Sequence, residues 1–294
     1  MNYTRAFLLS AVIAILSAPI VSGNRSLCNG IFPPNNVRIE ATDPAAGGIT
    51  LAEFNRILDQ IEAYYRPIAS SQGGNLQISR LWDNAEANAS ATRSWDGRTW
   101  NLNMYGGLAR HPSMNSDGFM LVACHEMGHH VGGAPKSSGF FGFNDWASNE
   151  GEADYFATLR CLRFMFHEAD NTNFVATQSI DPLVRQKCEE VYSTQAEENL
   201  CMRIGMAGYV LSTVGKDLKK LTVAPAFNTP DQSVVSQTND DHPELQCRLD
   251  TYFQGALCRH DMTVALSNSN PAIGTCSDNA NGNLGARPHC WFRP

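Results

Sequence analysis

The stretch SDGFMLVACHEMGHHV, residues 116–131, has the signals of a helix and of its two ends. Ser116 or Asp117 can cap a helix, and the apolar run Met120–Val122 carries it forward. The sequence Gly132-Gly-Ala-Pro135 follows. Glycine favours a helix C-terminus and proline cannot continue a helix. The sequence therefore predicts one helix over the whole stretch.

Two histidines lie four residues apart in that helix, in the segment His125-Glu-Met-Gly-His129. Residues at i and i+4 are about 40° apart around a helix, so both imidazoles project from one face. Two nitrogens held in this way can take adjacent corners of a zinc tetrahedron at about 2.0–2.1 Å. Glu126 stands beside the first histidine, where its carboxylate can reach water at the metal. The pattern predicts that His125 and His129 bind zinc and that Glu126 is a general base.

Two histidines leave one protein ligand to be found. One known pattern places a third histidine six residues after the second, but Pro135 stands there and has no ligating group. The other option is a glutamate from the next helix, in the segment 148–154, SNEGEAD. Glu150 and Asp154 share a helix face, whereas Glu152 points about 200° away from Glu150. We therefore expect Glu150 to bind zinc and Asp154 to hydrogen-bond a ligand histidine, which fixes its tautomer.

The flanking sequence predicts further elements of a mostly helical α+β fold. Thr50-Leu-Ala-Glu53 is a capping box, and apolar residues at helical spacing follow it to about Pro67. The segment Trp100–Tyr105 alternates strictly, which is typical of a strand with one buried face. We expect residues 98–105 to be the edge strand of a small sheet, along which an extended substrate lies. Other predicted segments are a strand at 76–78 and helices over 150–167, 182–192 and 195–214.

The first 23 residues have the layout of a secretory signal peptide. Arg5 supplies a positive charge, residues 6–16 are almost wholly apolar, and small residues precede position 24. The alternative is a single membrane anchor. With cleavage, residues 24–294 form one domain with its core at about 50–258. We expect an exported protein, periplasmic or extracellular, with no stable membrane insertion.

Nine cysteines fit an oxidising compartment. Eight of them can form four disulfides, but spacing does not decide the connectivity. We expect Cys124 to be a buried free thiol. We expect Cys276 and Cys290 to form a disulfide within the polar tail at 266–294. Cys247 and Cys258 fall on one predicted helix about 16 Å apart, too far for a disulfide.

The composition excludes several classes of protein. Of 294 residues, 43% are hydrophobic and 17% are charged, which is the profile of a globular chain. The formal net charge is −7, whereas proteins that bind nucleic acids usually carry a positively charged surface. The expected partner is therefore a protein or peptide substrate rather than a nucleic acid.

Taken together, the motifs resemble the HtpX-like and CAAX-prenyl-endopeptidase-like gluzincins, metallopeptidase family 48. The matching blocks occur in the family's order, at residues 83–88, 105–109, 125–129, 150–157 and 241–249. The resemblance implies a zincin-like fold with one zinc ion per chain, bound by His125, His129 and Glu150. It also implies that His242 lies near the substrate oxyanion. Because proline suits the first position of a helix, we expect His242 to be the N-cap of a helix over 243–258.

The expected function is that of a secreted or periplasmic zinc endopeptidase. Two alternatives remain: a catalytically inactive zinc-binding protein, and a zinc hydrolase of the peptide cross-links of peptidoglycan. Glu126 favours catalysis over the first alternative, because a structural zinc site does not require it.

Overall fold

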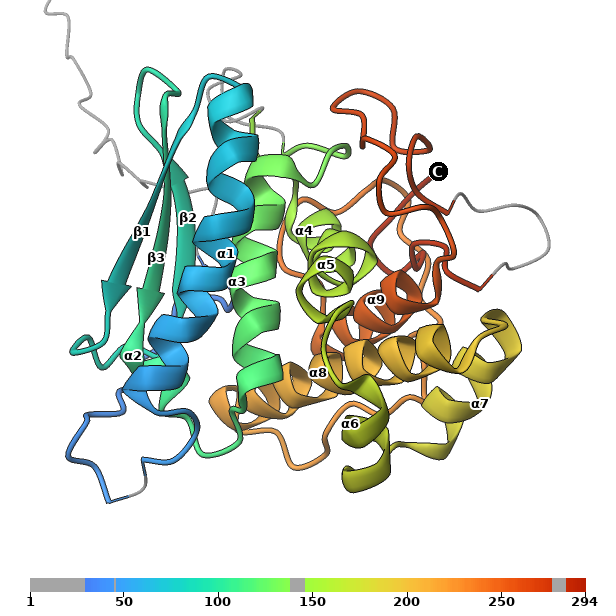
Figure 1. The fold of residues 1–294 in the computed structure, drawn as a ribbon, viewed down its shortest axis with the longest axis horizontal. Coiled ribbons are helices and arrows are strands. Elements are labelled where there is room, and N and C mark those ends of the chain that lie inside the picture. Colours follow the sequence, from blue (N-terminus) through green and yellow to red (C-terminus); the bar gives the residue numbers. More distant parts are fainter. Residues whose placement is uncertain (1–29, 45, 138–145, 277–283) are drawn as a thin grey trace, which may run out of the picture.

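The computed structural model describes residues 30–44, 46–137, 146–276 and 284–294 of the chain. Figure 1 shows a small sheet at one side of the molecule, with α1 and α3 between it and helices α4 to α9. The α+β class expected from the sequence is confirmed. The elements are α1 (Leu51–Ser71), β1 (Asn75–Leu81), β2 (Ala89–Arg93), β3 (Thr99–Tyr105), α2 (Gly106–Ala109), α3 (Ser116–Val131), α4 (Glu150–Phe156), a π-helical turn (Ala157–Cys161), α5 (Leu162–Phe166), α6 (Asn171–Thr177), α7 (Pro182–Val191), α8 (Gln195–Leu218) and α9 (Leu245–Leu257).

The sheet has the strand order β1-β3-β2. β1 pairs with β3 in parallel, and β2 pairs with β3 in antiparallel register. The expectation that residues 98–105 form an edge strand is wrong, because β3 is the central strand. Its alternation arises because Trp100, Leu102 and Met104 face the core. Alternation reports which face of a strand is buried, and an inner strand of a one-sided sheet has the same pattern as an edge strand.

Helix α1 begins at the capping box that the sequence predicts. The Thr50 hydroxyl accepts a hydrogen bond from the Glu53 amide at 3.2 Å, and the Glu53 carboxylate accepts one from the Thr50 amide at 3.0 Å. The helix does not end near Pro67 but continues to Ser71. Proline removes one backbone donor, but Ala69 beyond it still packs in the core.

Helix α3 is buried along nearly its whole length and packs against the sheet, α1, α4 and α8. Its N-cap is Asn115, whose side chain accepts a hydrogen bond from the Gly118 amide at 2.9 Å. Asp117, a cap candidate in the sequence, instead accepts two 2.8 Å hydrogen bonds from Arg203 on α8. A helix enclosed in this way is a rigid support for the side chains it carries.

Four disulfides join the described cysteines: Cys124–Cys161, Cys188–Cys201, Cys247–Cys290 and Cys258–Cys276. The expectation of a free Cys124 is wrong, because α3 packs against the π-helical turn that ends at Cys161. The expected Cys276–Cys290 pair is also wrong, since each of these cysteines bonds to a cysteine at one end of α9. Cys247 and Cys258 do not pair with each other, as predicted.

The predicted signal peptide at 1–23 and the ninth cysteine, Cys28, lie outside the described residues. Within the described ranges, no helix combines the length and the apolar character needed to cross a bilayer. Four disulfides are consistent with an oxidising compartment.

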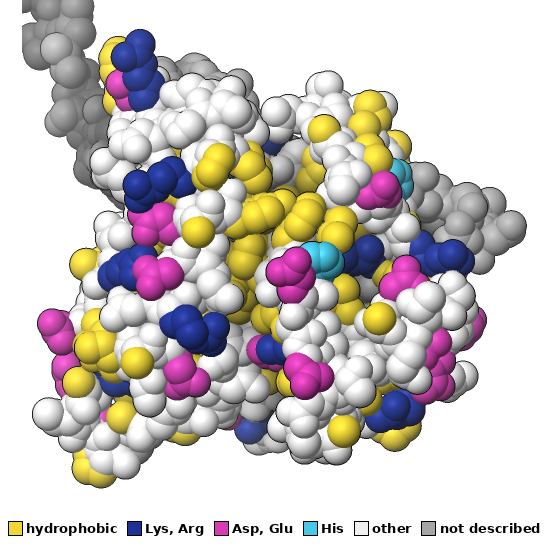
Figure 2. All heavy atoms as spheres, viewed as in Figure 1, with side chains coloured by type: hydrophobic (Ala, Val, Ile, Leu, Met, Phe, Trp, Pro, Cys, Tyr) yellow, Lys and Arg dark blue, Asp and Glu magenta, His cyan; other side chains and the backbone are white. Residues whose placement is uncertain are grey.

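A groove of about 440 Å³ opens beside α1, between that helix, α5 and the segment 262–268. Figure 2 shows hydrophobic side chains gathered in a hollow on this face of the molecule. Tyr64, Ile68, Phe164 and Leu266 are among its lining residues. None of the predicted zinc ligands lines this groove.

Candidate metal centre

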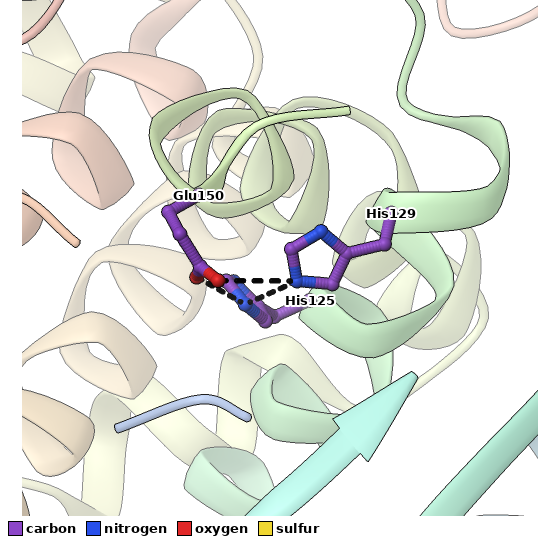
Figure 3. A group of neighbouring side chains, drawn as sticks. All are labelled: His125, His129 and Glu150. Atoms are coloured by element: carbon purple, nitrogen blue, oxygen red, sulfur yellow. Dashed lines mark hydrogen bonds and ion pairs between the residues drawn. The ribbon is translucent and has the colours of Figure 1, made fainter. Parts of the chain in front are cut away.

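His125 and His129 of α3 and Glu150 at the start of α4 point toward one another, as Figure 3 shows. The two Nε2 atoms are 3.1 Å apart. The Glu150 carboxylate oxygens lie 3.3 Å from His125 Nε2 and 3.8 Å from His129 Nε2. The structure thus brings all three predicted ligands into one buried group that could hold a metal ion.

The donor set and its spacing fit zinc. Two ligands at about 2.0–2.1 Å from a tetrahedral zinc ion are roughly 3.3 Å apart, close to the observed separations. Both carboxylate oxygens of Glu150 are buried and accept no hydrogen bond from the described residues. A buried carboxylate without a donor is costly unless a cation compensates its charge.

The crossing of α3 and α4 sets this geometry. At Gly128, a Cβ atom would lie 2.9 Å from the backbone of Ala153, so glycine lets the two helices approach closely. Asn149 caps α4 by accepting a hydrogen bond from the Glu152 amide at 2.9 Å. Its side-chain amide also donates to the Asn239 carbonyl at 3.2 Å, which ties the helix start to the segment before α9.

The other nitrogen of each histidine is held by an acceptor. His129 Nδ1 lies 2.8 Å from the Ser148 carbonyl oxygen, and His125 Nδ1 lies 2.7 Å from Asp154 Oδ1. Because a carbonyl oxygen can only accept, His129 Nδ1 must carry the proton. At His125 the acceptor is a carboxylate, and Nδ1 can donate to it in the same way. In both histidines the lone pair of Nε2 is then free to bind a metal ion.

Asp154 is the centre of a buried polar network. Arg248 of α9 donates two hydrogen bonds to its carboxylate, at 2.7 and 2.8 Å, and the Tyr252 hydroxyl donates a third at 2.7 Å. Burial opposes the charge on Asp154, but Arg248 and His125 hold the pKa of its carboxyl well below the ordinary value. Sequence analysis assigned no role to Arg248 or Tyr252. Arg248 falls in the matching block at residues 241–249, and Tyr252 lies four residues further along the same helix.

Glu126 lies fully buried beside the group, and its carboxylate oxygens accept no hydrogen bond from the described residues. Burial raises the pKa of Glu126 to about 8. The positive charge of a metal ion at the three ligands would lower that pKa. The side chain is therefore able to exchange a proton near neutral pH, which is what a general base requires.

Electrostatics also distinguish the two histidines. Burial lowers the pKa of His129 to about 4, which keeps its imidazole neutral. Burial opposes the charge on His125 too, but the carboxylates of Asp154 and Glu150 outweigh it and raise its pKa to about 9. Metal binding would therefore release a proton from His125.

His242 is not the N-cap of α9. That helix begins at Leu245 with Glu244 as its N-cap, because Pro243 fixes only its own φ and Glu244 is still extended, with a ψ of 154°. The imidazole nevertheless reaches the metal group: its Nε2 lies 3.3 Å from Glu150 Oε2 and 2.7 Å from the Gly30 carbonyl oxygen. Its side chain is 14% exposed.

Glu152 faces away from the metal group, as predicted from its helical position. Arg287 donates two hydrogen bonds to its carboxylate, at 2.5 and 2.8 Å, and both side chains are buried. No local pattern in the sequence indicated this pair, because its members are 135 residues apart.

Comparisons of the chain with protein-family models, curated proteins and solved structures found no match. The function is therefore argued from the site itself: two histidines and a glutamate that can hold a metal ion, with a second glutamate beside them that has no partner among the described residues.

Proposed function

We propose that the protein is an exported zinc-dependent endopeptidase of the gluzincin type. The observation that carries the proposal is the position of Glu126, a buried carboxylate without a described hydrogen-bond donor, next to the group His125, His129 and Glu150. A structural zinc site has no use for such a carboxylate, whereas hydrolysis needs a base at that place.

Each residue has a separate task in this proposal. His125, His129 and Glu150 would hold zinc, which lowers the pKa of water and polarises a carbonyl group. Glu126 accepts a proton from the attacking water and passes it to the leaving amine. Asp154 keeps His125 in the tautomer that ligation needs, and His242 can donate a hydrogen bond from Nε2 to the oxygen on which charge develops.

Strand β2, rather than β3, is the edge that would bind an extended substrate. Among the described residues β2 pairs with β3 as a strand, and apart from the Ala89 carbonyl, which accepts from the Ile31 amide, its other edge offers main-chain groups to a peptide. β2 also packs against α3, the helix that carries His125 and Glu126. A peptide added to this edge would lie next to the helix of the metal group.

The decisive experiment measures zinc content and peptide cleavage on the same purified protein. We expect one zinc ion per chain by mass spectrometry and cleavage of a peptide library that stops on chelation. Glu126→Gln should keep zinc and fold but lower kcat by a factor on the order of 10³ or more, because the base is lost. His167→Gln is the matched control, since His167 is exposed and lies outside the site.

The outcomes separate the three readings of the site. Zinc binding with no hydrolysis of peptides or of peptidoglycan fragments would support an inactive zinc-binding protein. Hydrolysis confined to peptidoglycan cross-links would identify that substrate instead. Full activity of Glu126→Gln with stoichiometric zinc would remove Glu126 from the mechanism.

A further inference from the structure

Residues 30–32, which we call the strap, run along the start of β2. The Ile31 amide donates to the Ala89 carbonyl at 3.1 Å. The Asn88 side chain binds Phe32 twice, accepting from its amide at 3.1 Å and donating to its carbonyl at 3.0 Å. The strap therefore uses the same edge of β2 that a peptide substrate would use.

The strap also contacts the residues on the α9 side of the metal group. The Gly30 carbonyl oxygen lies 2.7 Å from His242 Nε2, and Arg248 donates a hydrogen bond to the Ile31 carbonyl. Because a carbonyl can only accept, His242 Nε2 must carry a proton, and that proton is used by Gly30. Figure 3 shows a blue segment, the colour of the first described residues, close to the three ligands.

The backbone at Gly30 is fitted closely to this position. Its φ is +92°, a region that side-chain-bearing residues rarely adopt. A Cβ atom there would lie 2.2 Å from the Ala89 carbonyl oxygen and 2.6 Å from Asn88 Oδ1. Glycine thus lets a main-chain carbonyl reach His242 while the chain stays against β2.

We propose that the strap is an autoinhibitory contact, in which the Gly30 carbonyl occupies the position of a substrate carbonyl. This inference rests on the proposed peptidase function. The strap blocks the start of the β2 edge and takes the hydrogen bond that His242 would give to substrate. A peptide must displace Gly30 before it can accept the hydrogen bond from His242, and it can pair with β2 only beyond the position that Ile31 holds at Ala89.

Only part of the strap can move at low cost. Ile31 is fully buried and Phe32 is 3% exposed, and both belong to the main hydrophobic core. Removing either side chain from the core would expose apolar surface to water, which is unfavourable. The part of the strap that can move is therefore Gly30, and activation is the release of its carbonyl from His242.

The first experiment substitutes Gly30→Ala in the full chain, with Gly73→Ala as the matched control. Gly73 also has a positive φ, of +76°, but a Cβ there meets nothing within 4 Å. Losing one hydrogen bond that competes with substrate should raise kcat/KM on peptides by roughly two- to tenfold. Zinc should also leave Gly30→Ala faster in excess chelator, and Gly73→Ala should match the wild type in both assays.

A second measurement does not depend on whether Gly30→Ala folds. Residues 24–29 are replaced by the recognition sequence of a site-specific protease, and the folded protein is assayed before and after cutting. Cutting should raise kcat/KM by the same factor, because it frees Gly30 from the chain before it.

The outcomes keep the two proposals apart. Faster zinc loss without peptide cleavage in any variant would support the strap and reject the peptidase function. Peptide cleavage that falls in Gly30→Ala, and also falls on cutting, would show that Gly30 positions His242, and it would overturn the inhibitory role while leaving the peptidase intact. Unchanged zinc loss and unchanged kcat/KM in both experiments would also overturn it.

Discussion

The two faces of helix α4 bury carboxylates to the same extent and use them in different ways. Glu150 and Asp154 face α3, and Glu152 faces the segment 284–294. All three side chains are at most 3% exposed. Both carboxylate oxygens of Glu152 accept hydrogen bonds from Arg287, whereas Glu150 accepts no described hydrogen bond. Burial alone therefore does not identify a metal ligand; what sets Glu150 apart from Glu152 is that no arginine or other described donor binds its carboxylate.

The largest effect is expected at Glu150, the carboxylate without a described hydrogen-bond donor. Glu150→Gln removes a ligand, so we expect loss of bound zinc and a fall in turnover on the order of 10³. Metal-free stability should change little, because the Glu150 oxygens accept no described hydrogen bond. Metal content by mass spectrometry and urea denaturation of the metal-free protein test both statements. Stoichiometric zinc in this variant would remove Glu150 from the ligand set.

Substitution of Glu152, which is paired with Arg287, should instead lower the stability of the metal-free protein. Glu152→Ala leaves the Arg287 guanidinium buried without its counter-ion, which typically costs about 3–5 kcal/mol of unfolding free energy. The double variant Glu152→Met with Arg287→Met should recover most of that loss, since no buried charge remains. Urea denaturation of the metal-free proteins measures both. If the double variant were as unstable as the single one, the ion pair would not be the cause.

Asp154 belongs to both sides of the comparison, because it is paired like Glu152 but also touches a proposed ligand. Asp154→Asn should weaken zinc affinity by roughly 10–100-fold through the loss of its effect on His125. It should also destabilise the metal-free protein, because Arg248 loses its carboxylate. Zinc competition against a chromophoric chelator gives the affinity, and an unchanged value would limit Asp154 to a structural role.

The smallest effect is expected at Tyr252, which donates a single hydrogen bond to Asp154 at 2.7 Å. Tyr252→Phe keeps the ring in the core and should cost about 1 kcal/mol of unfolding free energy. Zinc affinity should fall only a few-fold, because Arg248 still holds Asp154. A loss of zinc as large as that of Asp154→Asn would show that Tyr252, rather than Arg248, sets the orientation of Asp154.

The features that the sequence could predict are those with local causes. Capping residues and helical spacing determine α1, α3 and α4, and the i, i+4 rule is enough to bring His125 and His129 together. The choice of Glu150 over Glu152 follows from the same rotation around a helix. These inferences need no knowledge of which segments meet in space.

The features that were missed depend on contacts between distant segments. β2, with the sequence ASATR, lacks the bulky alternating residues that mark a strand and is formed by pairing with β3. The same holds for the cysteine pairs, the N-cap of α9 and the contact between Gly30 and His242. Each depends on which distant segments of the chain lie next to one another. Gly30 and His242 are 212 residues apart.

The ties between α4 and the segment 284–294 also determine when the metal group can form. Arg287 holds Glu152, the Tyr155 hydroxyl donates to the Gly285 carbonyl at 2.6 Å, and Trp291 packs against Gly151. A growing chain lacks these ties until synthesis has passed residue 291. We therefore expect Glu150 to take its final position beside His125 and His129 only after these contacts have formed. Late completion of the site would keep the proposed peptidase activity off until the chain has folded.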